Sequence, residues 1–208
     1  MPDLLHKERN FVMEKTFFQK TFNLSRYLLV FVILNTFLSL TSRLLIFLFD
    51  NEVFSRKIVV IQNKLYLVSM IFLLVAITLL LLLSTLLAIE LTDRYKTDEI
   101  SNSFESVKQT MRLRYFLIQH ETIPSSVNSF QKNPILQDFN KSVAGSIVDV
   151  RNESVVVVLK YPVSQQSQQI FRSMESHVKE EISNYNPNFY FSSPIRIGNK
   201  LFYKGSKR

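Results

Sequence analysis

The chain has 208 residues and a formal net charge of +8, with no cysteine, no tryptophan and only three glycines. The absence of cysteine excludes disulfides, thiolate nucleophiles and cysteine-ligated metal sites. Three glycines at positions 145, 198 and 205 exclude the Gly-rich loops that cradle phosphates in dinucleotide-binding and Walker-type folds.

Two long apolar runs, Tyr27 to Phe49 and Leu65 to Ile89, indicate the class of protein. The hydrocarbon core of a membrane is about 30 Å thick, and a helix needs about 20 apolar residues to cross it. The second run carries no charge, and the chain that follows it is too short to bury such a helix in a soluble core. We therefore expect a membrane protein: a two-helix transmembrane hairpin within residues 27–92, followed by a small α+β cytoplasmic domain.

Basic residues near the ends of the apolar runs predict the orientation of the hairpin. Five precede the first run, three lie between the runs, and five follow the second run as far as Arg114. This distribution predicts that both termini and the soluble domain lie in the cytoplasm.

Residues 1–26 precede the first run and combine positive charges with apolar residues. The apolar positions are Leu4, Leu5, Phe11, Val12, Phe17, Phe18 and Phe22. This composition is typical of an amphipathic helix on an anionic membrane surface. An irregular flanking segment is the alternative.

Four polar residues of the first run share one helical face: Asn35, Ser39, Ser42 and Arg43. Polar groups in lipid are costly and face other helices or water. They predict either the lining of a pore, or a polar seam, or helix packing through small polar residues with Arg43 reaching the outer headgroups.

Residues 93–122 are expected to connect the hairpin to the soluble domain, with a helix from Asp98 to Ile118. An apolar stripe recurs along this helix at Ile100, Phe104, Val107, Met111 and Ile118. The spacing suits either a coiled-coil seam or a helix packed on the domain.

Residues 123–208 are expected to form an α+β sensor domain. The predicted elements are a loop over Ser125 to Asn140, strands over Ser142 to Val150 and Ser154 to Tyr161, a helix from Ser164 to about Tyr185, a strand over Phe189 to Phe191, and a hairpin over Ile195 to Tyr203. Four consecutive valines in the second strand predict a central position in the sheet. Gly198-Asn199 is the predicted hairpin turn.

Basic residues exceed acidic ones between Asp93 and Arg208, by 16 to 11. Basic surface beside exposed aromatic side chains suits phosphates and stacked bases. The candidate ligand-binding residues are Arg172, Lys179, Tyr190, Arg196 and Lys200. A basic tail resting on anionic lipid is the alternative for the C-terminal lysines.

The sequence contains no motif for catalysis or for metal binding. His6, His120 and His177 are far apart, and there is no His-x-x-x-His pair. We therefore expect a protein that is not an enzyme, that has no catalytic residues, and that needs no metal or cofactor.

The hairpin of Tyr27–Phe49 and Leu65–Ile89, with the basic α+β domain ending in Lys-Gly-Ser-Lys-Arg, resembles the two-transmembrane effectors of bacterial antiviral defence. It is similar in plan to the membrane-bound ancillary effectors of type III CRISPR systems, whose soluble domain binds cyclic tetra-adenylate. The resemblance implies a homo-oligomer in the bacterial inner (cytoplasmic) membrane. Such an oligomer would bind a cyclic oligonucleotide, with cyclic tetra-adenylate favoured, and perturb the lipid bilayer.

Two other functions fit the same features. A structural membrane subunit of a conjugation or secretion apparatus also combines an anchor with a small α+β domain, and binds protein rather than nucleotide. A membrane-bound regulator would use its basic face on DNA, with steep salt dependence from counterion release.

Overall fold

The computed structural model describes residues 15–48, 56–120 and 133–208. Two compact units divide the chain: residues 20–90 form one, and the described residues through Gln19 join Leu91–Arg208 in the other. The predictions made for Leu4, Leu5, Phe11 and Val12 lie outside the described residues, as do those for loop residues 121–132.

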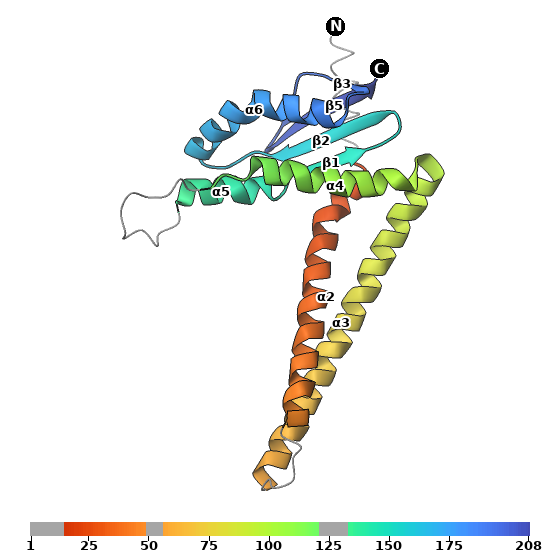
Figure 1. Cartoon of the computed structure of the whole chain (residues 1–208), viewed down its shortest axis with the longest axis vertical. Helices are drawn as coiled ribbons and strands as arrows, with labels where there is room; N and C mark the ends of the chain where they lie inside the picture. The colour runs from red at the N-terminus through yellow and green to blue at the C-terminus, as the bar shows by residue number, and fades with distance from the viewer. Residues whose placement is uncertain (1–14, 49–55, 121–132) are drawn as a thin grey trace. The chain divides into compact units, whose positions relative to one another are not determined.

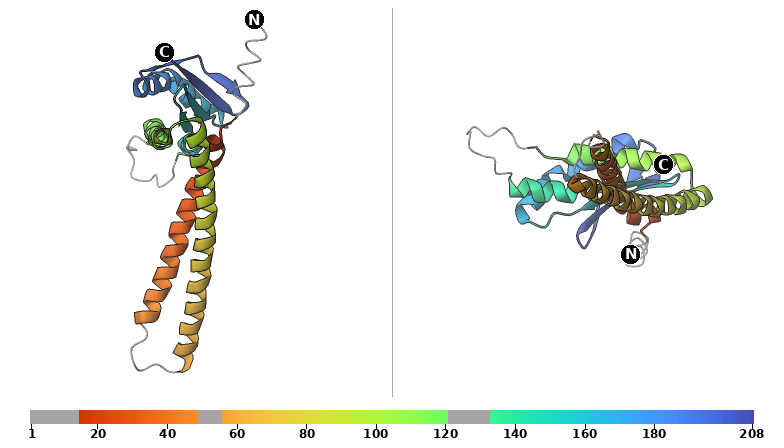
Figure 2. Two further views of the ribbon diagram at one scale, coloured as in Figure 1. Left: turned by 90° about the vertical axis from the view of Figure 1, so that its right-hand side faces the viewer. Right: turned by 90° about the horizontal axis from the view of Figure 1, so that it is seen from below.

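Two helices are long and apolar enough to cross a membrane: α2 (Phe17–Leu48) and α3 (Arg56–Thr97), the latter from Val59 onward. Of the most apolar 18 residues in each helix, only 6% are buried in α2 and 17% in α3, so most of these side chains are exposed. Within residues 20–90 the two helices run side by side (Figures 1 and 2). The two predicted apolar helices are confirmed. Helix α2 begins earlier than the predicted Tyr27, and α3 extends beyond both predicted bounds.

The other unit is an α+β domain (Figure 1). Its helices are α4 (Ile100–Leu117), α5 (Pro134–Val143) and α6 (Gln165–Tyr185). Its strands are β1 (Ile147–Val150), β2 (Ser154–Lys160), β3 (Phe189–Phe191), β4 (Ile195–Ile197) and β5 (Lys200–Lys207). All pairings are antiparallel, in the order β1-β2-β5-β3, and β4 pairs with the first half of β5.

The predicted α+β class and most of its elements are confirmed. The valine strand β2 lies between β1 and β5, as its apolar sequence predicts. Helix α6 begins where the Ser164 side chain accepts a hydrogen bond from the Ser167 amide. The β4–β5 hairpin turns at Gly198, whose φ of 58° lies in the left-handed region that glycine adopts without strain.

The main core lies between one face of the sheet and its helices. Its members include Val155, Val157 and Leu159 of β2 and Phe171 and Ile182 of α6, all buried. The opposite face carries a smaller apolar cluster around Val158 and Phe202. The alternation follows from the two-residue period of a strand, which sends successive side chains to opposite faces.

Two predictions about the start of the domain are wrong. The expected loop over residues 125–140 contains the beginning of α5, and the expected strand from Ser142 begins only at Ile147. Asn133 and Pro134, read as a turn, start the helix instead: the Asn133 side chain accepts from the Ile135 amide and Pro134 occupies the first turn. Both are favoured there, since the first helical amides have no partner within the helix.

Helix α4 runs along the outer edge of β1 (Figure 1) and presents its polar face to the strand. Ser106 and Thr110 accept hydrogen bonds from the Val150 and Val148 amides, both at 2.9 Å. Arg114 donates to the Ser146 carbonyl at 2.6 and 2.9 Å. These side chains therefore satisfy backbone groups at the edge of β1, where an unpaired strand would invite aggregation.

The predicted stripe of α4 consequently faces outward. Ile100, Phe104, Val107, Met111 and Ile118 are all exposed. Packing of this stripe on the domain is thus the wrong alternative, because α4 packs on the domain with another side. That side carries Ser106, Thr110 and Arg114 together with the core residues Leu113 and Leu117. The helix is also separate from α3, which ends at Thr97, whereas α4 begins at Ile100.

Candidate functional site

Two of the predicted ligand-binding residues meet at one aromatic ring. Arg172 of α6 donates from Nε to the Tyr161 hydroxyl at 3.2 Å. The guanidinium carbon of Arg196, on β4, lies 3.9 Å from the centre of the same ring. Tyr161 itself is buried and packs against Phe171, with ring centres 5.0 Å apart. The ring therefore positions two exposed guanidinium groups, which we call the arginine pair.

A third predicted residue, Lys200, belongs to a group that we call the lysine cluster, comprising Lys15, Lys160 and Lys200. Lys160 and Lys200 are directly opposite each other in the β2–β5 pairing. Burial, and then the charges of Lys15 and Lys160, lower the pKa of Lys200. Within the described chain, no ion pair joins these lysines to a carboxylate. Like charges opposed across a sheet are destabilising, so the cluster is a favourable place for an anion.

The two groups occupy the same end of the sheet but opposite faces. Arg196 pairs with Leu201, whose side chain lies in the main core beneath the helices. Lys200 is the next residue and therefore points to the other face, with Lys160. Arg172, Arg196 and Lys200 are three of the four basic residues that the sequence singled out. They therefore lie on two faces at one end of the sheet rather than in one pocket.

The structure does not bring Lys179 and Tyr190 to this end. Tyr190 pairs with Ser206 at the far end of β5, six residues from Lys200, or about 20 Å along a strand. Lys179 lies two helical turns beyond Arg172 on α6, about 10 Å away along the axis. Tyr190 is exposed and Lys179 half-buried, so both serve as reference positions for tests of the site.

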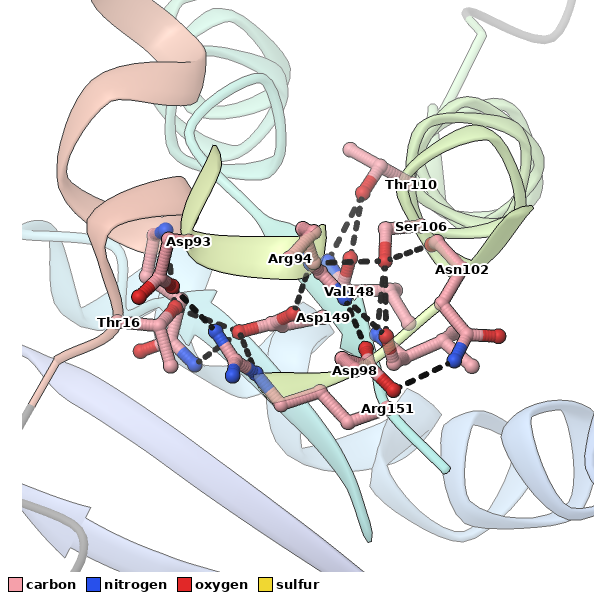
Figure 3. A network of polar contacts seen from close by, with 12 residues as sticks. Thr16, Asp93, Arg94, Asp98, Asn102, Ser106, Thr110, Val148, Asp149 and Arg151 are labelled. Carbon is pink, nitrogen blue, oxygen red and sulfur yellow. Dashed lines mark hydrogen bonds and ion pairs between the residues drawn. The ribbon is translucent and has the colours of Figure 1, made fainter. Parts of the chain in front are cut away.

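A buried network of polar contacts, shown in Figure 3, centres on Arg94 in the last turn of α3. Arg94 donates to Asp149 Oδ1 and to the Val150 carbonyl, both at 2.6 Å, and to Asp98 Oδ2 at 2.9 Å. Its side chain and that of Asp149 are 0% and 1% exposed. Burial of an unpaired charge is very costly, so the three acceptors are what permit this arginine to lie inside the domain.

Asp149 also accepts hydrogen bonds from two residues at the beginning of α2. Thr16 donates from its hydroxyl to Asp149 Oδ2 at 2.5 Å, and Gln19 donates from Nε2 to the same oxygen at 3.2 Å. The residues that begin α2 and those that end α3 are therefore held by one carboxylate on β1. Phe18 is buried and lies under the guanidinium of Arg94, 5.4 Å from ring centre to guanidinium carbon.

Asp98 closes the network on the side of α4. It accepts from the Asn152 amide at 3.0 Å and from Asn102 Nδ2 at 2.8 Å. Burial alone would raise the pKa of Asp98, but these hydrogen bonds and the one from Arg94 outweigh it, and the pKa is lowered. Asp98 is thus held as a carboxylate at neutral pH.

The predicted polar face of the first apolar helix takes part in helix packing. Ser39 is buried and donates to the Ser69 carbonyl of α3 at 3.0 Å, and Arg43 Nε donates to the Ser69 hydroxyl at 3.3 Å. Asn35 and Ser42 donate to carbonyls one turn earlier on their own helix. These contacts support the packing interpretation for Ser39. Arg43 contacts α3, whereas that interpretation had it reaching the outer headgroups. The pore interpretation stays a prediction.

Sequence reasoning missed Tyr161, Lys160, Lys15, Arg94 and Asp149. A signal existed for Asp149, the one acidic residue in an otherwise apolar strand, since a buried carboxylate requires partners. Arg94, close after the apolar run, was counted only for topology. No local pattern relates Lys15 to Lys200, because their proximity depends on the tertiary fold.

Comparisons with known proteins found no match: no family model, no curated protein and no solved structure matches the chain. Among the described residues, no group of three or more acidic or histidine side chains could hold a metal ion.

Proposed function

We propose that this protein is a membrane-anchored receptor whose α+β domain binds a phosphate-bearing ligand at the lysine cluster. The observation that carries the proposal is the juxtaposition of Lys15, Lys160 and Lys200 without a carboxylate partner in the described chain. Charge-assisted hydrogen bonds to phosphate oxygens would relieve the repulsion among the three ammonium groups. The arginine pair lies at the same end of the sheet but on its other face. It provides two further groups of donors, either for a ligand that extends around this end of the sheet or for a neighbouring subunit.

The ligand class that we propose is a cyclic oligonucleotide, with cyclic tetra-adenylate the first to test. Such a ligand carries several phosphates around a ring, so symmetry-related subunits of a homo-oligomer can each supply the same few cations. One lysine cluster per subunit meets that requirement. The role is binding rather than catalysis, with cations as the functional groups.

The anchor in this proposal is the pair of helices α2 and α3. Their exposed apolar surface is far larger than the patches that soluble monomers leave in water, and lipid would cover it. The excess of basic residues at the cytoplasmic ends expected for these helices supports an orientation with both termini and the sheet domain in the cytoplasm, at the inner membrane of a bacterium.

The buried network offers a route from ligand to membrane. Thr16 and Arg94 connect the beginning of α2 and the end of α3 to Asp149, so a shift of β1 displaces both helix ends. In the proposed antiviral effector, oligomers rearranged in this way would perturb the bilayer along the polar residues Asn35 and Ser39. A two-state sheet domain, biased by ligand, is sufficient for such coupling.

Leakage of dye from vesicles tests this function. Full-length protein reconstituted in dye-filled vesicles is mixed with cyclic di-, tri- and tetra-adenylate, and release is recorded. The proposal expects release with one cyclic oligonucleotide and none without it, and loss of the response in Lys160→Gln/Lys200→Gln. Intact vesicles with every ligand, from protein shown to be folded, would favour the assembly subunit, which should instead co-purify with protein partners.

A further inference from the structure

Beyond ligand binding, the outward stripe of α4 requires an explanation. Phe104 and Tyr115 are 73% and 82% exposed, and four aliphatic or sulfur-containing residues continue the same line: Ile100, Val107, Met111 and Ile118. The opposite side of the helix is committed to the edge of β1 through Ser106, Thr110 and Arg114. The stripe therefore cannot turn inward without breaking those hydrogen bonds.

The period of the stripe indicates the shape of its partner. With Tyr115 included, six residues from Ile100 to Ile118 mark five turns over 18 residues, or 3.6 residues per turn. A coiled-coil seam repeats every 3.5 residues, and its heptad would use position 114 rather than 115. Arg114 is buried against Ser146 and unavailable for a seam. A straight stripe on a straight helix fits a flat apolar surface better than a supercoiled helix.

The length of chain between the apolar run and α4 supports a position of α4 at a membrane surface. Eight residues of α3 separate Ile89, the end of the uncharged run, from Thr97, a rise of about 12 Å. The headgroup layer is about 5–8 Å thick and a helix radius about 5–6 Å, which together match that rise. A helix that starts at Ile100 can thus lie on the headgroups, with its long side chains reaching the hydrocarbon boundary.

Side chains beside the stripe suit that position. Lys108, whose side chain is 62% exposed, borders the stripe and can reach lipid phosphates. Lys108 pairs with Glu105 at 3.2 Å, so the local charge is nearly balanced and apolar burial is the main attraction. Tyr115 is of the type that is enriched at membrane interfaces, and Phe104 is typical of the apolar face of an interfacial helix.

We propose that α4 is an interfacial helix whose stripe, from Ile100 to Ile118, lies in the headgroup region of the membrane that α2 and α3 cross. In this arrangement α4 lies between the edge of β1 and the lipid. Ser106, Thr110, Arg114 and the core residues Leu113 and Leu117 face the protein, and the stripe faces the lipid. The occupant of the stripe is lipid, not a second copy of the chain.

Because the chain contains no cysteine, single cysteines can test this directly. Phe104→Cys, Met111→Cys and Tyr115→Cys are labelled with an environment-sensitive dye in full-length protein, in vesicles with or without doxyl-labelled lipid. Ser173→Cys, at an exposed position on α6, is the matched control. All four sites are exposed in the isolated chain, so labelling there should leave the fold intact.

The proposal expects doxyl lipid to remove most of the fluorescence at positions 104, 111 and 115, with blue-shifted emission, and to leave position 173 unchanged. Quenching of all four sites by aqueous iodide would show a solvated stripe and overturn the proposal. Shielding from both quenchers, together with disulfide crosslinking between subunits at position 111, would overturn it in favour of a second copy.

Discussion

Arg94 and Asp149 form a fully buried ion pair, 2.6 Å from Nη2 to Oδ1, between the last turn of α3 and the edge strand of the sheet. The same carboxylate accepts a hydrogen bond from the hydroxyl of Thr16, the residue that precedes α2. A single side chain on β1 therefore holds both points at which the apolar helices enter the domain. This relationship makes the ion pair a structural requirement and the natural point of transmission in the proposed receptor.

Removing one partner of the pair should be strongly destabilising. Arg94→Met leaves Asp149 buried without its main donor, and we expect a loss of about 3–5 kcal/mol in the free energy of unfolding. Denaturant unfolding of the full chain in detergent, followed through the sheet domain, measures this loss. Lys207→Met is the control, because the Lys207–Glu153 pair is exposed and worth about 0–1 kcal/mol. Equal small losses in both variants would contradict the structural role of Arg94.

The cover that α4 provides for β1 can be tested with one hydroxyl. Ser106→Ala leaves the buried Val150 amide without its acceptor, which should cost about 1–3 kcal/mol. Hydrogen exchange at the Val150 amide should also be faster in Ser106→Ala, because that amide loses its hydrogen bond. Ser173→Ala is the matched control, since the Ser173 hydroxyl is exposed and bonds only to a carbonyl of its own helix. Unchanged protection of Val150 in Ser106→Ala would show that α4 does not cover this edge.

The stabilisation that Asp98 contributes to the fold should depend on pH. Its pKa is lower in the folded chain than the ordinary value of 3.8, so the folded state favours the carboxylate. The stabilisation is complete well above that ordinary value and is lost as the pH falls through the lowered pKa. Asp98→Asn should therefore be less stable than wild type at pH 7, and the difference should shrink toward pH 3. Unfolding curves at a series of pH values measure this, and a constant difference at every pH would contradict it.

Gly205 should be intolerant of any side chain. A Cβ atom at this position would lie 2.9 Å from two ring atoms of Phe191, which is buried in the core. Gly205→Ala should therefore lower the free energy of unfolding by about 1–3 kcal/mol through overpacking. Adding Phe191→Leu should recover part of that loss, because the two changes share one contact. Strictly additive losses in the double variant would contradict the proposed clash.

Elements that depend on local patterns could be predicted from the sequence. The valine strand, the helix that ends at Tyr185 and the Gly198 hairpin all follow from periodicity or from a residue with special backbone freedom. Helix α5 was missed because the same Asn-Pro pair that suggests a turn also serves as a helix start. Only the residues that follow Pro134 distinguish a turn from a helix start, and α5 is too short for its apolar residues to show a clear helical period.

Tertiary relationships could not be predicted in the same way. The apolar stripe of α4 was visible, but the usual rule places such a stripe against the core. Here the free edge of β1 needs hydrogen-bond partners, and Ser106 and Thr110 supply them, so the helix faces the other way. Likewise, Arg172 and Arg196 were predicted to bind a ligand because of their charge. Their shared contact with the ring of Tyr161 depends on the tertiary fold and could not be predicted.

Ligand binding by the lysine cluster is tested most directly by calorimetric titration of the full-length protein in nanodiscs with cyclic tetra-adenylate. We expect binding in the micromolar range or tighter, weakened by about tenfold or more in Lys160→Gln/Lys200→Gln, since each lost charge-assisted contact is worth about 1.5–3 kcal/mol. Lys179→Gln, elsewhere on the domain, should bind as wild type does. Flat titrations with cyclic di-, tri- and tetra-adenylate from folded protein, or equal binding by the double lysine variant, would contradict it.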